Sequence, residues 1–257
     1  MIKNYLLRRP LLLTLFLLGY LLFLLVSLPA AQILPRLPLP AGLQLRNING
    51  TLWQGSISEV SWQKYRLQNL QWEVLFSQLW LGMPTIKLDI QDPETITATG
   101  TIGWRAKWHL RDWHIKTAAN TLQNWAPVPL PIHATGAIQL NIEQLVIDHQ
   151  ACQTLTGQLN WQQALINTPS GALVLGNPTA SLNCQNNAFT AAIKQDSAAL
   201  HSQVSVQLNL QGQYKLQATL RPDTELPDAL HSALGWLGSP DNKGNILTKQ
   251  EGYLPYF

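Results

Sequence analysis

Apolar and polar residues alternate with a period of two along most of this 257-residue chain beyond residue 42. The clearest examples are the stretches 204–210 and 214–220, in which every second residue is apolar. Because successive side chains of a strand point to opposite faces of a sheet, this pattern predicts strands with one buried face. We therefore expect a mainly β protein built as a long antiparallel meander sheet, partly rolled, with one or two short helices.

The phase of the alternation also predicts how some strands pair. A two-residue turn at Gln63-Lys64 puts Trp62 opposite Tyr65, with all the flanking apolar residues on one face. The phase then reverses beyond Gln68-Asn69, which predicts a bulge or a short turn there. The pattern therefore predicts a hairpin whose second strand is distorted.

Near the C-terminus the phase predicts a three-residue turn at 211–213. That turn places Leu210 opposite Tyr214, and Gly212 can supply a positive φ. Residues 226–237 carry apolar residues at helical spacing and predict one short amphipathic helix. The segments 75–81 and 118–125 can each hold a short helical turn, and 246–248 can return as a final strand.

The alternation over 96–110 predicts one long strand with two contrasted faces. Trp104 and Trp108 lie on the apolar face, and Arg105, Lys107 and Arg111 form a basic stripe on the other. A basic stripe is most often a solvated face, and contact with anionic headgroups or an acidic partner is the alternative. The tryptophans either pack in a core or line an apolar groove for lipid or a partner. These five residues are the candidate contact residues.

The N-terminal residues predict a membrane anchor. The run 11–28 is rich in leucine and contains no Asp, Glu, Lys or Arg, which is just long enough to cross a bilayer as a helix. Basic residues precede it, so the positive-inside rule places residues 1–10 in the cytoplasm. A cleaved signal peptide is the alternative, and it would put the body in the same compartment.

The remaining chain divides into a neck and a body. Four prolines in 29–41 predict an extended, stiff neck. Residues 42–257 are then expected to form a β-rich domain on the periplasmic side, and the chain is expected to cross the membrane once. Cys152 and Cys184 would oxidise in a periplasm, so we expect a structural disulfide, with free buried thiols or a redox role as alternatives.

No catalytic motif is present in the sequence. The histidines are scattered, and no H-E-x-x-H, G-x-S-x-G, P-loop or dinucleotide fingerprint occurs. The net charge is only +3, which gives no case for nucleic-acid binding. We expect no enzyme activity, no cofactor and no metal site.

A family resemblance is carried by two segments. The first is Gly50-Thr51-Leu52-Trp53-Gln54-Gly55, which follows the anchor and the neck. The second is the cysteine segment, in which Cys152 precedes 155–161 and Cys184 closes a later alternating stretch. Together with the late helix, these residues resemble the type II secretion system protein N family. The family motif residues are Gly50, Thr51, Leu52, Trp53 and Gly55.

The resemblance implies an accessory inner-membrane component of the machine that exports folded proteins across the outer membrane. It implies contact with other inner-membrane components of that system, and it brings no catalytic residue. The family is also similar to the AsmA-like group, whose β-rich periplasmic domains are linked with lipid transport. The alternative is therefore a periplasmic module that binds or transfers phospholipid in a Trp-lined groove.

Overall fold

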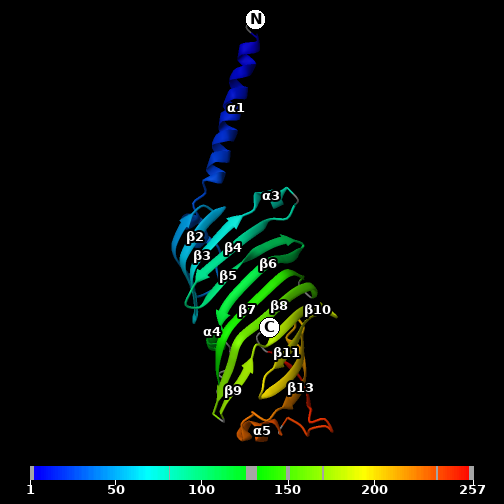
Figure 1. The fold of residues 1–257 in the computed structure, drawn as a ribbon. Coiled ribbons are helices and arrows are strands. Elements are labelled where there is room, and N and C mark those ends of the chain that lie inside the picture. Colours follow the sequence, from blue (N-terminus) through cyan, green and yellow to red (C-terminus); the bar gives the residue numbers. More distant parts are fainter. Residues whose placement is uncertain are drawn as a thin grey trace. The chain divides into compact units, whose positions relative to one another are not determined.

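The computed structural model describes residues 3–80, 82–125, 132–148, 151–169, 171–235 and 237–254, with backbone only for 3–11 and 233. The chain forms two compact units, residues 1–74 and 75–257. The second unit is mainly β, and both contain antiparallel strands that, apart from β9, pair in chain order (Figure 1). The predicted antiparallel meander is confirmed.

The first unit combines an N-terminal helix with three strands. Its elements are α1 (Lys3–Val26), α2 (Ala30–Ile33), the 3-10 helix η1 (Leu34–Arg36), β1 (Leu43–Gly50), β2 (Gln54–Trp62) and β3 (Tyr65–Val74). Among the described residues, no helix has both the length and the apolar character needed to cross a bilayer.

The prolines predicted an extended neck, but the neck is extended only in part. It begins with the short helices α2 and η1, and only the residues that follow are free of helix. Pro29 is the N-cap of α2, and Pro35 lies in the first turn of η1. Proline is tolerated at both places because the first N–H groups of a helix have no partner inside it.

The β2–β3 hairpin has the predicted register, with Trp62 opposite Tyr65. The predicted break is also present, since Asn69 adopts a φ of 51° and the apolar phase changes there. The register is the same on both sides, so the distortion is not a bulge. Asn47 on β1 adopts a φ of 54° in the same row. Asn is one of the few non-glycine residues that tolerate this backbone conformation.

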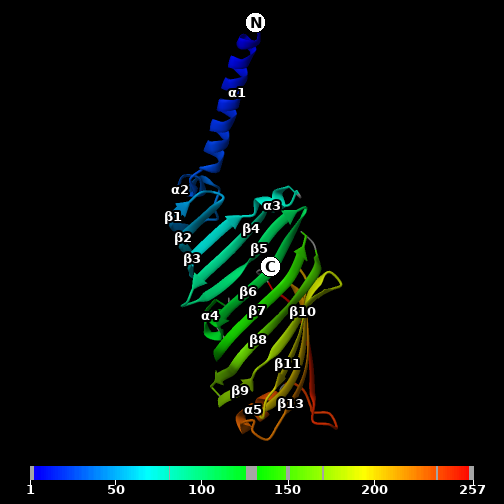
Figure 2. The same cartoon turned by 45° about the horizontal axis from the view of Figure 1, so that its top comes forward.

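The second unit holds the remaining strands and three short helices. Its elements are α3 (Phe76–Leu79), β4 (Thr85–Asp92), β5 (Ile96–Arg105), β6 (Lys107–Ala118), α4 (Ala119–Trp125), β7 (His133–Ile147), β8 (Cys152–Thr168), β9 (Gly171–Gly176), β10 (Thr179–Gln185), β11 (Ala188–Asp196), β12 (Leu200–Leu208), β13 (Gln213–Pro222), α5 (Asp228–Leu234) and β14 (Ile246–Tyr253). Strands β4 to β8 lie side by side (Figure 2), and β9 pairs only with β8.

Helical segments are more numerous than the one or two predicted. The described residues include α2, η1, α3, α4 and α5 besides α1. Three of these lie in the segments that predicted helical turns, at 75–81, 118–125 and 226–237. The two in the neck were missed, because proline content was taken to oppose helix.

One face of the second unit is apolar across nine strands. Residues directly opposite one another on neighbouring strands share a face, so the pairing defines this surface. We call it the apolar face. Its two longest rows are Ile90, Ala98, Ile115, Leu140, Leu159, Ala180, Ile193, Val204 and Ala218, and Trp113, Ile142, Gly157, Leu182, Ala191, Val206 and Leu216.

Bulges keep the apolar residues on that face where the spacing in the sequence changes. The β5–β6 register shifts between Thr99 and Thr101, and Asp112 on β6 adopts a φ of 53°. The apolar residues of β6 are even-numbered up to Leu110 and odd-numbered from Trp113. A bulge adds one residue to one strand, so it restores the phase and bends the sheet.

The predicted single strand over 96–110 is wrong. Ala106, with a φ of 56°, turns the chain between β5 and β6. The alternation continues through this turn because a tight hairpin is symmetric, and residues equidistant from Ala106 share a face. A continuous pattern therefore concealed a reversal of the chain.

The predicted three-residue turn at 211–213 is also wrong. Tyr214 lies opposite Leu208, not Leu210, so the pairing is two residues away from the expected register. The Asn209 side chain accounts for the longer loop, because its Oδ1 accepts the N–H groups of Gln211 at 3.1 Å and Gln213 at 2.8 Å. A shift of two keeps every side chain on its face. Gly212 has the predicted positive φ, at 84°.

The best-packed core of the second unit lies where β8, β9, β12 and α5 meet. Ala164, Leu175 and Leu200 are buried there, and Leu234 of α5 packs against them. The chain then returns as β14, which extends the final strand predicted at 246–248. The sheet is nevertheless open, because no pairing in the described part of the chain joins β14 back to β4.

Candidate functional site

The family motif forms the turn between β1 and β2. Gly50 and Gly55 are paired, and Gly50 has a φ of 89°. A Cβ on Gly55 would lie 2.4 Å from the Trp72 ring, so only glycine fits beneath that ring. The Thr51 hydroxyl accepts the Gln54 N–H at 3.2 Å and closes the turn. The conformation of Gly50, the hydrogen bond of Thr51 and the ring contact of Gly55 therefore each explain the residue type at that position.

The same turn holds the C-terminal end of α1. The Leu52 N–H donates to the Leu28 carbonyl at 3.0 Å, and the Trp53 indole N–H donates to the Leu25 carbonyl at 2.8 Å. Pro29 forms a β-bridge with Thr51. The Leu25 carbonyl is among the last of α1, where carbonyls lack an i+4 partner inside the helix, and the Leu28 carbonyl lies two residues beyond the helix. The hairpin therefore supplies donors to both. We call this contact the motif brace.

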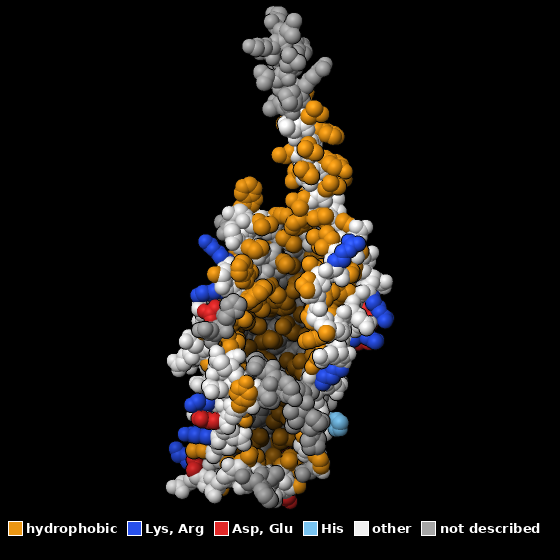
Figure 3. Space-filling model, turned by 180° about the vertical axis from the view of Figure 1, so that it is seen from behind, with side chains coloured by type: hydrophobic (Ala, Val, Ile, Leu, Met, Phe, Trp, Pro, Cys, Tyr) orange, Lys and Arg blue, Asp and Glu red, His pale blue; other side chains and the backbone are white. Residues whose placement is uncertain are grey.

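The apolar face of the second unit is only partly covered. Figure 3 shows hydrophobic side chains lining a hollow in this unit, with charged side chains along its flanks. Trp104 and Trp108 are directly opposite one another on β5 and β6, and they are 50% and 46% exposed. Trp113, in contrast, is 8% exposed and stacks on Gly100. Trp113 therefore packs in the core, whereas a contact role for Trp104 and Trp108 stays a prediction.

The predicted basic stripe is divided between two strands. Arg105 at the end of β5 lies opposite Lys107 at the start of β6, and Arg111 lies further along β6. The Lys107 ammonium donates to the Gln153 side chain on β8. Arg111 lines a cavity of about 230 Å³ together with His109 and Thr85. The five candidate contact residues thus cluster around one hairpin.

Cys152 and Cys184 form the predicted disulfide, with their Cα atoms 5.6 Å apart. Cys152 begins β8 and is 1% exposed, and Cys184 lies at the end of β10. The Cys152 N–H also donates to the Asn187 carbonyl at 3.1 Å. The bridge therefore fixes the β10–β11 turn to the beginning of β8.

Two carboxylates on the second unit have perturbed acidity. The pKa of Asp241 lies below its ordinary value of 3.8, because the Asn245 and Lys243 N–H groups donate to this carboxylate. The pKa of Asp223 is also lowered, by the Thr224 N–H and by His201. Both carboxylates close loops beside β13 and β14. Hydrogen bonds to a charged group favour its ionised form.

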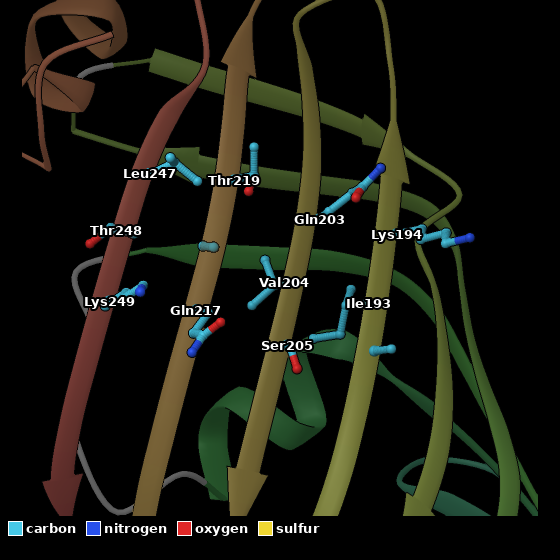
Figure 4. Close-up of a pocket in the computed structure, with 12 residues that line it drawn as sticks. Ile193, Lys194, Gln203, Val204, Ser205, Gln217, Thr219, Leu247, Thr248 and Lys249 are labelled. Atoms are coloured by element: carbon cyan, nitrogen blue, oxygen red, sulfur yellow. The ribbon is translucent and has the colours of Figure 1, made fainter. Parts of the chain in front are cut away.

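The opposite face of the sheet is polar and carries a shallow depression of about 280 Å³ across β11 to β14. Figure 4 shows residues from these four strands around it, including Lys194, Gln203, Thr219 and Leu247. Within the described ranges, no group of three or more His, Cys, Asp or Glu side chains could hold a metal ion.

The sequence profile of the family described as "Type II secretion system (T2SS), protein N" matches residues 41–248. The chain belongs to this family. No solved structure matches the fold.

Several named relatives agree with this assignment. The type II secretion system protein N of Aeromonas hydrophila is 34% identical over 96% of this chain and 99% of its own length. The protein of the same name from Vibrio cholerae is 33% identical over 89% of this chain and 92% of its own. That of Pectobacterium carotovorum is 34% identical over 92% and 94%.

Sequence reasoning found the motif but not its contact with α1. The motif brace joins residues 28 positions apart, and no periodicity reports such a pair. It also missed the bulge that directs Trp113 inward. The only signal for that bulge was the change from even to odd apolar positions along β6.

Proposed function

We propose that this protein is an accessory inner-membrane component of the type II secretion system, and that it supports export of folded proteins through protein–protein contacts in the periplasm. The family match over residues 41–248 is the observation that carries this proposal. An open sheet with a half-exposed tryptophan pair suits binding better than catalysis, since aromatic residues with part of their surface exposed are typical anchors of interfaces.

We propose that α1 is a single-pass anchor with a cytoplasmic N-terminus. Residues 11–28 contain no charged residue, and basic residues precede them. The motif brace supports this arrangement, because it fixes the orientation of the helix end against the β1–β2 hairpin. The body then lies in the periplasm, where the disulfide forms.

Protease treatment of spheroplasts tests the topology. We expect cleavage of the chain beyond residue 41 without lysis, with a small protected N-terminal fragment. A cytoplasmic protein serves as the control for intact cells. Protection of residues 42–257 would mean that the topology is reversed.

A deletion strain tests the secretion role. We expect reduced export of the substrates of the system, restored by the full chain, and co-purification of the tagged chain with other inner-membrane components. Replacing Trp104 and Trp108 by alanine should weaken rescue, whereas Lys194→Ala on the polar face should not. Normal export in the deletion strain together with no association would overturn the proposal.

The second candidate function is binding of phospholipid acyl chains on the apolar face. The exposure of Trp104 and Trp108 favours it, and Figure 3 shows a hollow lined by hydrophobic side chains. Mass spectrometry of the purified full chain tests this alternative, which predicts co-bound phospholipid. A lipid-free chain that still supports secretion would exclude it.

A further inference from the structure

β14 ends the strand order of the sheet and has an open edge. It pairs with β13 from Ile246 to Tyr253 without a register shift, and no described strand pairs with its other edge. In Figure 4 it is the strand that carries Leu247, Thr248 and Lys249, and it is the outermost of the four strands with labelled residues. An open edge presents unpaired backbone groups, so natural proteins interrupt or cover such strands.

β1, at the other end of the strand order, is protected against pairing with another strand. β1 is interrupted by the positive φ of Asn47, and α2 packs beside it. β14 contains no proline and no residue with a positive φ. It is a regular strand of eight residues, suited to accept another strand.

One hydrogen bond shows which residues of β14 face the open edge. The Leu254 N–H donates to the Gly212 carbonyl at 2.8 Å, towards β13. In antiparallel pairs the residues alternate in the direction of their backbone groups. The N–H and C=O groups of Leu247, Lys249, Glu251 and Tyr253 therefore point away from β13. Gly238 lies beside the Leu247 carbonyl, where a Cβ on Gly238 would be 3.3 Å from the oxygen, so among the described residues the edge is free of other backbone from Lys249 to Tyr253.

The side chains of these four residues form an ordered series on the polar face. Leu247 is 63% exposed and Tyr253 is 60% exposed. The Lys249 and Glu251 side chains between them are also exposed, and Glu251 forms an ion pair with Lys215 of β13 at 3.4 Å. The series is apolar, basic, acidic, apolar. Read in the opposite direction it has the same apolar ends and the opposite charge at each inner position, so it is complementary to itself.

We propose that a second copy of this chain pairs with β14 edge to edge, antiparallel, about a two-fold axis through Gln250. In this register Leu247 faces Tyr253 of the second copy, and Lys249 faces Glu251 of the second copy. Each Lys249–Glu251 pair exchanges two backbone hydrogen bonds. The Leu247–Tyr253 pairs do so once the chain at Gly238 moves away from the Leu247 carbonyl. Two Lys–Glu pairs and two Leu–Tyr pairs then form on the polar face.

The charges select this register over its neighbours. A shift of the centre to Lys249 or to Glu251 would place two lysines or two glutamates directly opposite one another, which is unfavourable. If the two-fold axis passed between two residues, each residue with outward-facing backbone groups would lie opposite a residue with inward-facing ones. The self-complementary series is also the reason to assign a second copy as the occupant, since a two-fold interface needs a patch that matches itself.

Charge reversal in the full chain, purified in detergent, tests the proposal by sedimentation velocity. Lys249→Glu and Glu251→Lys should each raise the dimer dissociation constant by about tenfold or more, because each replaces two opposite-charge contacts by two like-charge contacts. The double variant K249E/E251K should restore the dimer. Lys194→Glu, on the same face but on β11, should have no effect.

A cysteine at the proposed axis gives an independent measurement. In this register the two Gln250 residues form a pair whose Cα atoms are about 4.5 Å apart, within the range that a disulfide can bridge. Gln250→Cys should therefore link two copies on mild oxidation. Thr248→Cys should not, since its nearest counterpart lies about 14 Å away along the strands.

The result that overturns the proposal is equally specific. A chain that stays monomeric, a dimer unaffected by K249E, or equal cross-linking of Q250C and T248C would each exclude pairing through β14 in this register. Folding of each variant is checked by circular dichroism. The native cysteines do not interfere, because both are in the disulfide.

Discussion

At the scale of single residues, close contacts between glycine and tryptophan shape the sheet. Trp113 packs flat on Gly100, where a Cβ would lie 2.4 Å from the ring, and Trp72 does the same to Gly55. The Trp113 indole N–H also donates to the Thr101 carbonyl at 3.0 Å. A large ring can be buried in a single-layer sheet only where a neighbouring residue has no side chain.

Gly100→Ala should therefore destabilise the fold by about 1–3 kcal/mol, because the added methyl group must displace the ring. Urea unfolding followed by circular dichroism measures the change. The variant Trp113→Leu provides the control, since G100A should cost much less in that background. Equal costs in both backgrounds would show that the contact with the ring is not the cause.

Asp241 is expected to make stability depend on pH. Its pKa is lowered in the folded protein by the N–H groups of Asn245 and Lys243, so its ionised form stabilises the 241–245 loop at neutral pH. Below the ordinary value of 3.8 the unfolded chain takes up the proton first, so this contribution falls with decreasing pH and is lost below the lowered pKa. Asp241→Asn should be less stable than the wild type at pH 7.

The measurement is urea unfolding of both proteins from about pH 7 down to about pH 3. The difference between them should shrink as the pH falls below 3.8. Asn retains one oxygen to accept the two backbone N–H groups, but it loses the second oxygen, which accepts the Asn245 side-chain amide at 3.1 Å. The comparison therefore removes the charge and this one hydrogen bond. A difference that stays constant over this range would contradict the assignment.

At the scale of elements, the motif brace connects the end of α1 to the first hairpin. Trp53→Phe retains the ring but removes the indole N–H that donates to the Leu25 carbonyl. We expect a loss of about 0.5–1.5 kcal/mol from the brace. Amide hydrogen exchange of residues 25–30 should be faster in the variant, whereas exchange in β12 and β13 should be unchanged.

The disulfide is the corresponding constraint in the second unit. Replacing both Cys152 and Cys184 by serine should lower the free energy of unfolding by about 2–4 kcal/mol, mainly because the unfolded chain regains freedom. A reducing agent should destabilise the wild type by a similar amount and leave the double variant unchanged. An effect of the reducing agent on the double variant would assign the loss to something else.

At the scale of the whole molecule, the sheet of the second unit has a core at one end and an open apolar surface elsewhere. Trp113→Ala should cost about 3–5 kcal/mol, as expected for a buried aromatic residue. Trp108→Ala should cost less than about 1 kcal/mol, since the side chain is already half-exposed. Thermal unfolding of the two variants compares them directly, and equal losses would mean that Trp108 belongs to a closed core.

Much of the fold was predictable from period-two alternation. The strands near the C-terminus, the Trp62–Tyr65 pairing and the three short helices of the second unit follow from local pattern. The sequence identified the residues of the candidate site, but it did not predict which segments those residues contact. The motif brace depends on contacts between segments far apart in the chain, and alternation cannot report those.

The sequence alone determined the mainly antiparallel architecture, the cysteine pair and the family motif, because side-chain periodicity and residue type act locally. Tertiary structure decided the register at Asn209, the reversal of the chain at Ala106 and the side of the sheet on which Trp113 lies. At Asn209 and Ala106 the alternatives keep the same apolar face, and at Trp113 the alternative moves one side chain to the other face. The choice therefore depends on loop hydrogen bonds and bulges, which hydrophobic pattern does not encode.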